Sequence, residues 1–439
     1  MRPAARPPAA VTRTTSDGTA ASRPVALPWV RAQSVNIARH AAALRPFRRG
    51  EFGTGSAAPS EGHLQAVNQL LSSLRSQLMK LTHRVASAGQ VATQDTNTAN
   101  LQQLVRSKEV GHHWVQAIER IWDFYFELFG QRQSQFADWL VSCDRIALDC
   151  YQVAFTGLGV ARSIPAPPPF SYVRTGFSPA TFRRGIPLRR LGRQLNPFPL
   201  IQLPYHRMVN PWTLGAVLHE VSHNLQNDLG LSRAVPRRVA SELLKAGLGS
   251  FVASVWTRWN REVFADLSAL LLGGPSIVGS LMDVVGRGPA ATMTYSPSGV
   301  HPTPYLRTLL SVELLRRMWF PEQAERYRRL WTSIYPAPST AQMPSPLVKS
   351  FPDASAVVLD AICFQPYRSL GNRSLWQVIR FQPKEQQMVE EAARRLAAGT
   401  DPGIIPARFL IGSTRVALDQ RLARPGVITK NFYTELARR

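Results

Sequence analysis

With 439 residues, 44% of them hydrophobic, the chain is long enough to bury a large core, and its three cysteines exclude a small fold that depends on disulfides. Its formal net charge of +24 comes from 52 basic residues against 28 acidic ones, and 46 of the basic residues are arginine. Because the arginines are widely scattered and no nucleic-acid recognition motif accompanies them, a basic nucleic-acid-binding protein is the least favoured interpretation.

The first 58 residues are rich in Arg, Pro, Ala, Ser and Thr, and Asp17 and Glu51 are their only acidic residues. This composition offers little apolar surface for a core, so residues 1–58 are predicted to form a disordered basic tail. An organelle transit peptide or an export signal has a similar composition and remains an alternative. No secretory signal is recognised, and we expect a cytoplasmic protein.

A helical pattern follows the tail. A 3-4-3-4 spacing predicts one helix seam, made by Leu64, Val67, Leu71, Leu74, Leu78, Leu81 and Val85. After a polar stretch, a second apolar series predicts a helix that folds back on the first, and it comprises Leu101, Val105, Trp114, Ile118, Ile121 and Tyr125. We therefore predict a helical hairpin or bundle over residues 59–160, with a coiled-coil dimer as the alternative.

A third helix is predicted over residues 136–155, where Cys143 and Cys150 are expected to be free core thiols, as is Cys363. Beyond it, the chain becomes irregular and rich in arginine and proline. Between Asp149 and Glu220 there is no acidic residue, so this segment should carry a positive field that attracts anionic partners, although a solvated basic face is the simpler explanation.

Two short strands are predicted in this irregular region, at residues 187–191 and 200–204. The second is expected to hold a substrate backbone by edge pairing. No transmembrane segment is predicted further on, because Gly273, Gly274 and Pro275 interrupt the longest apolar stretch.

The pattern H-E-x-x-H occurs at His219, Glu220 and His223. Asn210 is suited to cap a helix and Pro211 to its first turn, so a helix is predicted to begin here. At about 100° per residue, the apolar side chains form one stripe, and the two histidines project from the opposite side. The stripe consists of Leu214, Val217, Leu218, Val221 and Leu225. Histidines that only fill a core would share this stripe, so the pattern favours a zinc-binding pair.

Glu262 and Asp266 lie four residues apart on a second predicted helix, beside an apolar face of Trp256, Trp259, Val263, Leu267 and Leu270. A catalytic zinc ion usually has three protein ligands and keeps a further position open for water. Glu262 is the candidate third ligand, and Asp266 is the candidate acceptor of a ring N–H from a ligand histidine. A solvated acidic pair is the alternative.

Together these two segments resemble the gluzincin metallopeptidases, which combine H-E-x-x-H with a downstream E-x-x-x-D. The resemblance covers residues 210–272 and implies the zinc ligands His219, His223 and Glu262. It also implies Glu220 as the general base of a zinc-dependent peptidase that hydrolyses peptide bonds through a zinc-bound water. The metzincin arrangement is disfavoured, because no histidine stands six residues after His223.

His301-Pro302 and Arg307 follow the second helix. An H-P and a later arginine in the same order make this region resemble the soluble core of the CAAX prenyl protease family, although the membrane helices of that family are missing. The resemblance implies catalytic roles for His301 and Arg307, while local capping and ion pairing explain them equally well. Candidate donors to a tetrahedral oxyanion are, in order, His301, Tyr305, Arg307 and Tyr295.

Helices are predicted to dominate the rest of the chain. The expected fold is therefore mainly α (α+β), with a zincin-like core and a small β-sheet over residues 161–335 and a C-terminal helical region over residues 336–439. We expect a soluble zinc peptidase acting on a peptide or protein substrate, an acidic one if the positive field takes part. The main alternative is a non-catalytic helical scaffold stapled by zinc, which Glu220 disfavours because a structural site has no need of a general base.

Overall fold

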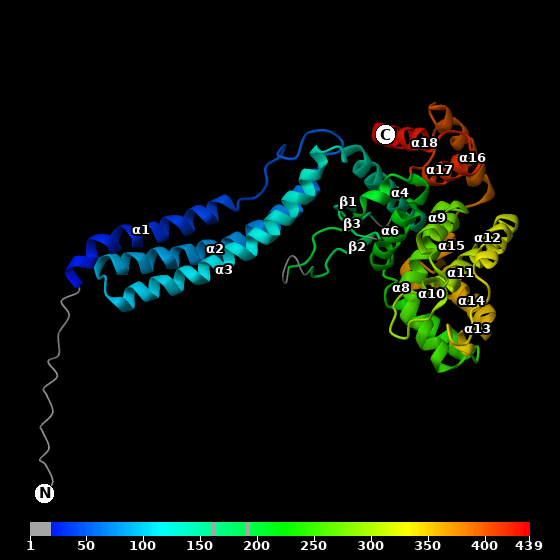
Figure 1. Cartoon of the computed structure of the whole chain (residues 1–439), viewed down its shortest axis with the longest axis horizontal. Helices are drawn as coiled ribbons and strands as arrows, with labels where there is room; N and C mark the ends of the chain where they lie inside the picture. Colours follow the sequence, from blue (N-terminus) through cyan, green and yellow to red (C-terminus); the bar gives the residue numbers. More distant parts are fainter. Residues whose placement is uncertain (1–18, 160–162, 177, 189–193) are drawn as a thin grey trace, which may run out of the picture. The chain divides into compact units, whose positions relative to one another are not determined.

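A computed structural model describes residues 19–159, 163–176, 178–188 and 194–439. Its described part is mainly helical with a small β-sheet, which confirms the predicted mainly α (α+β) fold class (Figure 1). Among these described residues, no helix is long and apolar enough to cross a membrane.

The chain divides into two compact units. The first comprises the described parts of Met1–Phe47 and Val67–Tyr125, and the second comprises Arg48–Ala66 and Phe126–Arg439. The division departs from the predicted boundaries, because a single apolar core in the second unit runs from Leu140 in the region assigned to the helical hairpin to Leu436 in the C-terminal region.

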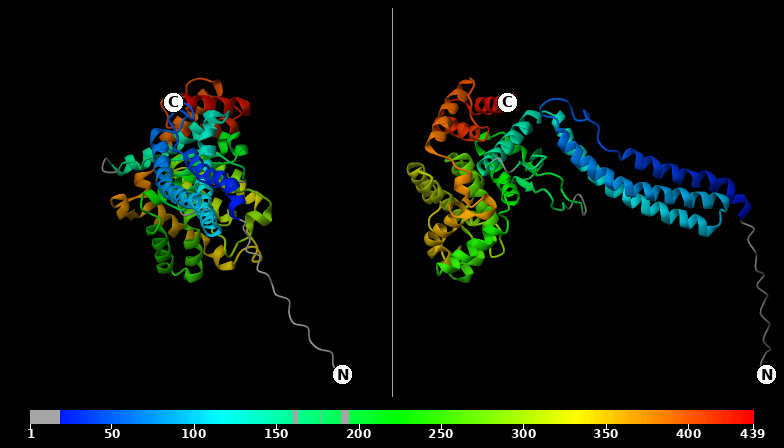
Figure 2. Two further views of the ribbon diagram at one scale, coloured as in Figure 1. Left: turned by 90° about the vertical axis from the view of Figure 1, so that its left-hand side faces the viewer. Right: turned by 180° about the vertical axis from the view of Figure 1, so that it is seen from behind.

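Three helices, in part or whole, make up the first unit: α1 (Thr19–Ala43), α2 (Glu61–Gln94) and α3 (Thr98–Gly130). They lie side by side in both views (Figure 1, Figure 2). The predicted hairpin is confirmed, because Val85 and Ala92 of α2 and Leu104 of α3 share one buried cluster. Its second seam is wrong at one position, since Val105 is exposed.

The prediction of a disordered tail over residues 1–58 is wrong for its described residues. Val30, Ile37 and Ala41 of α1 are almost fully buried, and the first two belong to the cluster shared with α2 and α3. These few apolar residues recur at helical spacing, which suffices because the hairpin supplies the rest of the core. Residues 1–18 of the predicted tail lie outside the described residues.

The second unit contains fifteen described α-helices. The first group comprises α4 (Ala137–Leu158), α5 (Tyr205–Met208), α6 (Gly215–Asp228), α7 (Ala234–Lys245), α8 (Gly249–Gly273), α9 (Ser276–Val285), α10 (Pro289–Met293) and α11 (Pro304–Arg317). The second comprises α12 (Pro321–Ile334), α13 (Ser345–Lys349), α14 (Phe351–Leu359), α15 (Leu375–Val378), α16 (Pro383–Ala398), α17 (Phe409–Asp419) and α18 (Pro425–Arg438). The predicted third helix is confirmed as α4, and all three cysteines are free and buried, as expected.

The main sheet has three strands, β1 (Phe170–Val173), β2 (Ala180–Phe182) and β3 (Leu200–Leu203), and a separate pair is formed by β4 (Pro366–Tyr367) and β5 (Arg373–Ser374). In the main sheet, β3 lies in the centre, parallel to β1 and antiparallel to β2. The strand predicted at residues 200–204 is thus confirmed as β3. Its expected edge pairing with a substrate is wrong, because both of its edges are already paired, and β1 and β2 are the edge strands.

The strand predicted at residues 187–191 is only partly open to comparison. Pro187 forms an isolated antiparallel bridge with Leu195. Residues 189–191 lie outside the described residues.

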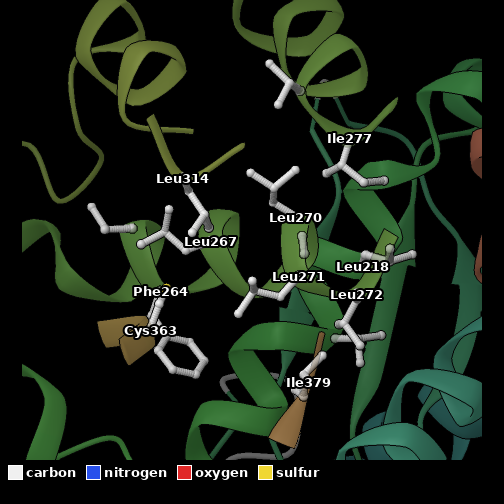
Figure 3. Packing of buried hydrophobic residues seen from close by; sticks show 14 of the residues in the cluster. Leu218, Phe264, Leu267, Leu270, Leu271, Leu272, Ile277, Leu314, Cys363 and Ile379 are labelled. Carbon is white, nitrogen blue, oxygen red and sulfur yellow. The ribbon is translucent and has the colours of Figure 1, made fainter. Parts of the chain in front are cut away.

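The C-terminal part of helix α8 lies within the apolar core of the second unit. Its residues from Val263 to Gly273 are all buried, as expected for a helix that is apolar on every side. Figure 3 shows its leucines packed against neighbours from several segments, including Leu218 of α6, Ile277 of α9 and Leu314 of α11. This packing fixes α8, and with it Glu262 and Asp266, against α6.

Candidate metal centre

The helix that carries H-E-x-x-H begins later than its sequence predicts. Asn210 makes no side-chain cap, and Pro211–Thr213 form one tight 3-10 turn before α6 starts at Gly215. The Asn210 carbonyl accepts hydrogen bonds from the Thr213 backbone N–H at 2.9 Å and from its hydroxyl at 2.8 Å. The cap is therefore made by backbone and by Thr213, and the predicted Asn210 side-chain cap is wrong.

The apolar stripe of α6 is buried as predicted. Leu214, Val217, Leu218, Val221 and Leu225 are each at most 1% exposed. On the side of α9, Gly215 approaches Ser280 so closely that an added Cβ would lie 2.6 Å from the serine Oγ. One side of α6 is packed in the core. On its other side, His219 and His223 line a cavity in the second unit.

Three side chains converge in that cavity at the positions predicted for zinc ligands. The Nε2 atoms of His219 and His223 are 3.2 Å apart, and each lies 3.4 Å from a carboxylate oxygen of Glu262. Two atoms that bind zinc at ~2.0–2.1 Å with tetrahedral angles are about 3.3–3.4 Å apart. Two imidazoles and one carboxylate are also a donor set that zinc prefers, so the residues fit this ion.

Asp266 orients the first histidine of the set. Its Oδ1 lies 2.8 Å from Nδ1 of His219, so a proton on Nδ1 leaves the Nε2 lone pair directed at His223 and Glu262. Arg307, on α11, holds the same carboxylate with two hydrogen bonds, from Nε to Oδ2 and from Nη2 to Oδ1 at 2.8 Å. Asp266 is only 6% exposed, so this pair of partners compensates a buried charge.

The charges of the cluster depend on one another. Burial opposes protonation of His219, but the hydrogen bond and charge of Asp266 outweigh it and raise the pKa of His219 to about 10. Burial, aided by the neighbouring His219, lowers the pKa of His223 to about 3. Burial also works against ionisation of Glu262, yet hydrogen bonding and charge from His219 hold its pKa well below the usual range. A cation at this site competes with the proton on His219, so the affinity for the cation should fall as pH falls.

Glu220 lines the same cavity beside the three candidate ligands. The residue is 7% exposed, and among the described residues its carboxylate has no hydrogen-bond partner. Burial raises the pKa of Glu220 to about 7. A carboxylate that is unpaired and has a pKa near neutrality is suited to take up and release a proton.

His301 reaches the cluster from the loop before α11. Its Nε2 lies 3.4 Å from Glu262 Oε2, and its side chain is 65% exposed at the mouth of the cavity. Arg258 of α8 anchors this loop through a 3.0 Å bond from Nε to the Gly299 carbonyl and a 2.9 Å bond to the Tyr295 hydroxyl. This role of Arg258 carries no signal in the sequence, because nothing local links it to a loop 41 residues away.

The four candidate oxyanion donors are not equivalent. His301 and Arg307 line the cavity, whereas Tyr305 and Tyr295 are not among its lining residues. The Tyr295 hydroxyl accepts a hydrogen bond from Arg258, and Tyr305 is 8% exposed. Of the predicted site residues, the structure thus brings His219, Glu220, His223, Glu262, Asp266, His301 and Arg307 together, and leaves the two tyrosines outside.

The edge strand β2 forms one wall of the cavity, which has a volume of about 960 Å³. Asn224 of α6 fixes this strand by donating a 2.7 Å hydrogen bond to the Thr181 hydroxyl, which in turn donates to the Leu200 carbonyl at 3.0 Å. β2 was missed in the sequence because three residues carry little periodicity. Its position beside H-E-x-x-H also depends on a contact across 43 residues.

Comparison with known protein families, curated proteins and solved structures finds no match to the chain. The assignment of the site therefore depends on its own residues. Their geometry fits a zinc ion, and the two sequence patterns, H-E-x-x-H and E-x-x-x-D, predict the same three ligands.

Proposed function

We propose that the chain is a zinc-dependent peptidase related to the gluzincins. His219, His223 and Glu262 are its zinc ligands and Glu220 is its general base. The observation that carries the proposal is the spacing of the three ligand residues. The two Nε2 atoms are 3.2 Å apart, His219 Nε2 lies 3.4 Å from Glu262 Oε2 and His223 Nε2 lies 3.4 Å from Glu262 Oε1, and these separations suit a tetrahedral zinc site. The unpaired Glu220 carboxylate in the same cavity favours an enzyme over a zinc-stapled scaffold.

A bound zinc ion lowers the pKa of water toward neutrality and polarises a peptide carbonyl. The Glu220 carboxylate accepts the proton from the attacking water and passes it to the nitrogen of the leaving amine. His219 keeps its Nε2 lone pair available because its Nδ1–H donates to Asp266. His301 is the proposed donor to the oxyanion, since it lies at the mouth of the cavity beside Glu262.

Arg307 has a different proposed role from His301. Its guanidinium is tied to Asp266 by two hydrogen bonds and lies 3.7 Å from Glu262. It therefore acts as a positioning residue that holds Asp266 and the ligand set in place. Local ion pairing, which the sequence left open, accounts for its contacts.

The proposed substrate is a peptide or a segment of a protein. The cavity of about 960 Å³ accommodates several residues, and one edge of β2, which no strand of the described residues pairs with, offers backbone groups for strand pairing. Arg183, Arg261 and Arg287 add positive charge to its lining, which favours acidic peptides.

Cleavage profiling tests the proposal. A proteome-derived peptide library is incubated with the zinc-loaded wild type and with Glu220→Gln, which is nearly isosteric and retains the three ligands. We expect cleavage by the wild type and a loss of about 10²- to 10⁴-fold in the variant, since the amide cannot accept the proton. Equal cleavage by both proteins would remove Glu220 from the mechanism. Zinc binding without any cleavage by the wild type would instead support the scaffold.

A further inference from the structure

We propose that Arg183 and Arg261 form an anion-binding subsite, which selects peptides with an acidic side chain close to the bond that is cut. The inference rests on the proposed peptidase function and names its substrate class. The pair lies in the wall of the same cavity as the candidate metal centre but takes no part in binding the ion.

The two arginines come from or next to two elements that both pack against α6. Arg183 directly follows β2, which the Asn224–Thr181 hydrogen bond fastens to α6. Arg261 lies on α8 immediately before the candidate ligand Glu262. Both side chains line the cavity that also holds the candidate metal centre.

The two guanidinium groups are close enough to repel each other. After burial, the charge of Arg261 is the next cause that lowers the pKa of Arg183. Among the described residues, neither guanidinium has an ion-pair or hydrogen-bond partner. The charge of Asp228 partly offsets this repulsion at Arg183, but neither guanidinium has a counter-ion in direct contact among the described residues, and a bound carboxylate relieves the remaining repulsion.

Two other arginines near the cavity are already committed to structural contacts. Arg258 anchors the loop that carries His301, and Arg307 is bound to Asp266. The negative side chains of the lining, Glu220, Glu262 and Asp266, belong to the metal centre. Arg183 also lies in the stretch between Asp149 and Glu220 that has no acidic residue. A carboxylate from the substrate can therefore supply the directly bound counter-ion that the pair lacks among the described residues.

The test uses matched peptides. A ten-residue peptide found by cleavage profiling is synthesised with Glu, Gln or Lys at each position next to the cleaved bond, and kcat/KM is measured for the wild type. At one of these positions, Glu should be preferred over Gln by about 10- to 100-fold, the range for hydrogen bonds to a charged group. The double variant Arg183→Gln/Arg261→Gln should reduce this ratio to about one, and Arg261→Glu should shift the preference toward Lys.

Arg237→Gln is the matched control, since Arg237 is exposed on α7 and does not line the cavity. It should keep the wild-type ratio of Glu to Gln. High salt should lower the ratio in the wild type, because the subsite is partly open to solvent. No preference for Glu in the wild type, or the same preference in the double variant, would overturn the subsite.

A binding measurement separates the subsite from the peptidase function. Fluorescence anisotropy of a fluorescein-labelled Glu-Glu peptide and of its Gln-Gln counterpart is measured with zinc-loaded Glu220→Gln protein. The Glu220→Gln protein should bind the Glu-Glu peptide more tightly than the Gln-Gln peptide, and this difference in affinity should disappear when Arg183→Gln and Arg261→Gln are combined with Glu220→Gln. That result supports the subsite even if the wild type hydrolyses nothing. Equal affinity for the two peptides contradicts the subsite even if the wild type is an active peptidase.

Discussion

The Nδ1 atom of His219 lies 2.8 Å from Oδ1 of Asp266, although the two residues are 47 positions apart in the chain. Asp266 thereby fixes the ring of one candidate ligand, and Arg307 fixes Asp266. This three-residue connection joins α6, α8 and α11 at the candidate metal centre. It makes the geometry of the candidate ligands dependent on a residue that is not itself one of them.

Replacing Asp266 by Asn should weaken zinc binding by about 10- to 100-fold, because the amide is a poorer partner for both His219 and Arg307. Competition with a chromogenic chelator measures the affinity, and circular dichroism checks that the variant is folded. Asp353→Asn, at an exposed position of α14, is the control and should leave the affinity unchanged. A folded Asp266→Asn protein with wild-type zinc affinity would contradict the role given to Asp266.

Gly215→Ala should destabilise the protein by about 1–3 kcal/mol, since overpacking at a close helix contact forces a shift. An added Cβ would lie 2.6 Å from Oγ and 2.9 Å from Cβ of Ser280, so α6 must move away from α9. Chemical denaturation measures the free energy of unfolding. Gly426→Ala in α18 is the control, because no atom lies within 4 Å of its new Cβ. Ser280→Gly in the Gly215→Ala background should restore part of the loss, and no rescue would refute the contact.

The part of the site that could be predicted from the sequence is the part held on two regular helices. His219 and His223 share a helix face at i and i+4, and the fixed period of the helix separates them from the apolar stripe. The same period places Glu262 and Asp266 beside the buried face of α8. Because these patterns are local, they can be recognised in the sequence without knowledge of the fold.

The parts that could not be predicted depend on distant partners. β2 is three residues long, and the hydrogen bond from Asn224 to the Thr181 hydroxyl holds it beside α6. α1 has few apolar residues, and its composition indicates disorder until the surface offered by α2 and α3 is considered. The start of α6 was misplaced because Asn210 uses its carbonyl group and leaves its side chain out of the cap.

Ile37→Ala tests whether α1 is part of the folded first unit. Ile37 is fully buried and lies under Gly111 of α3, so its truncation should cost about 2–5 kcal/mol in that unit. Hydrogen exchange of residues 19–47 measures the effect and should become faster. Val35→Ala is the control, because Val35 is 48% exposed on the same helix. Rapid exchange of this segment in the wild type would instead favour the tail predicted from composition.

Acidification should destabilise the second unit through His63. Its ring is buried, with Nδ1 2.7 Å from the Ser60 hydroxyl and Nε2 3.0 Å from the Pro168 carbonyl. A neutral ring satisfies both partners, accepting at Nδ1 and donating at Nε2. Burial lowers the pKa of His63 below its ordinary value of 6.5, although the Pro168 carbonyl and the charge of Asp144 oppose this.

Because the unfolded chain binds this proton more readily, stability is retained above the unfolded pKa of 6.5 and lost as pH falls below it. The loss is at most about 1.4 kcal/mol per pH unit. The free energy of unfolding, measured by denaturation at about pH 7.5 and about pH 5.5, should differ less between the two pH values for His63→Gln than for the wild type. His83→Gln, at an exposed position of α2, should behave as the wild type does. An unchanged difference in His63→Gln would assign the pH dependence to other groups.

The zinc content of purified protein tests the central claim most directly. After dialysis against zinc-free buffer, emission spectrometry should find about one zinc ion per chain in the wild type and in Glu220→Gln, because Glu220 is not a ligand. His219→Ala, His223→Ala and Glu262→Ala should each lose most of it, since a site with two remaining ligands holds the ion poorly. A wild type without zinc after zinc loading, or full zinc content in all three ligand variants, would contradict the account.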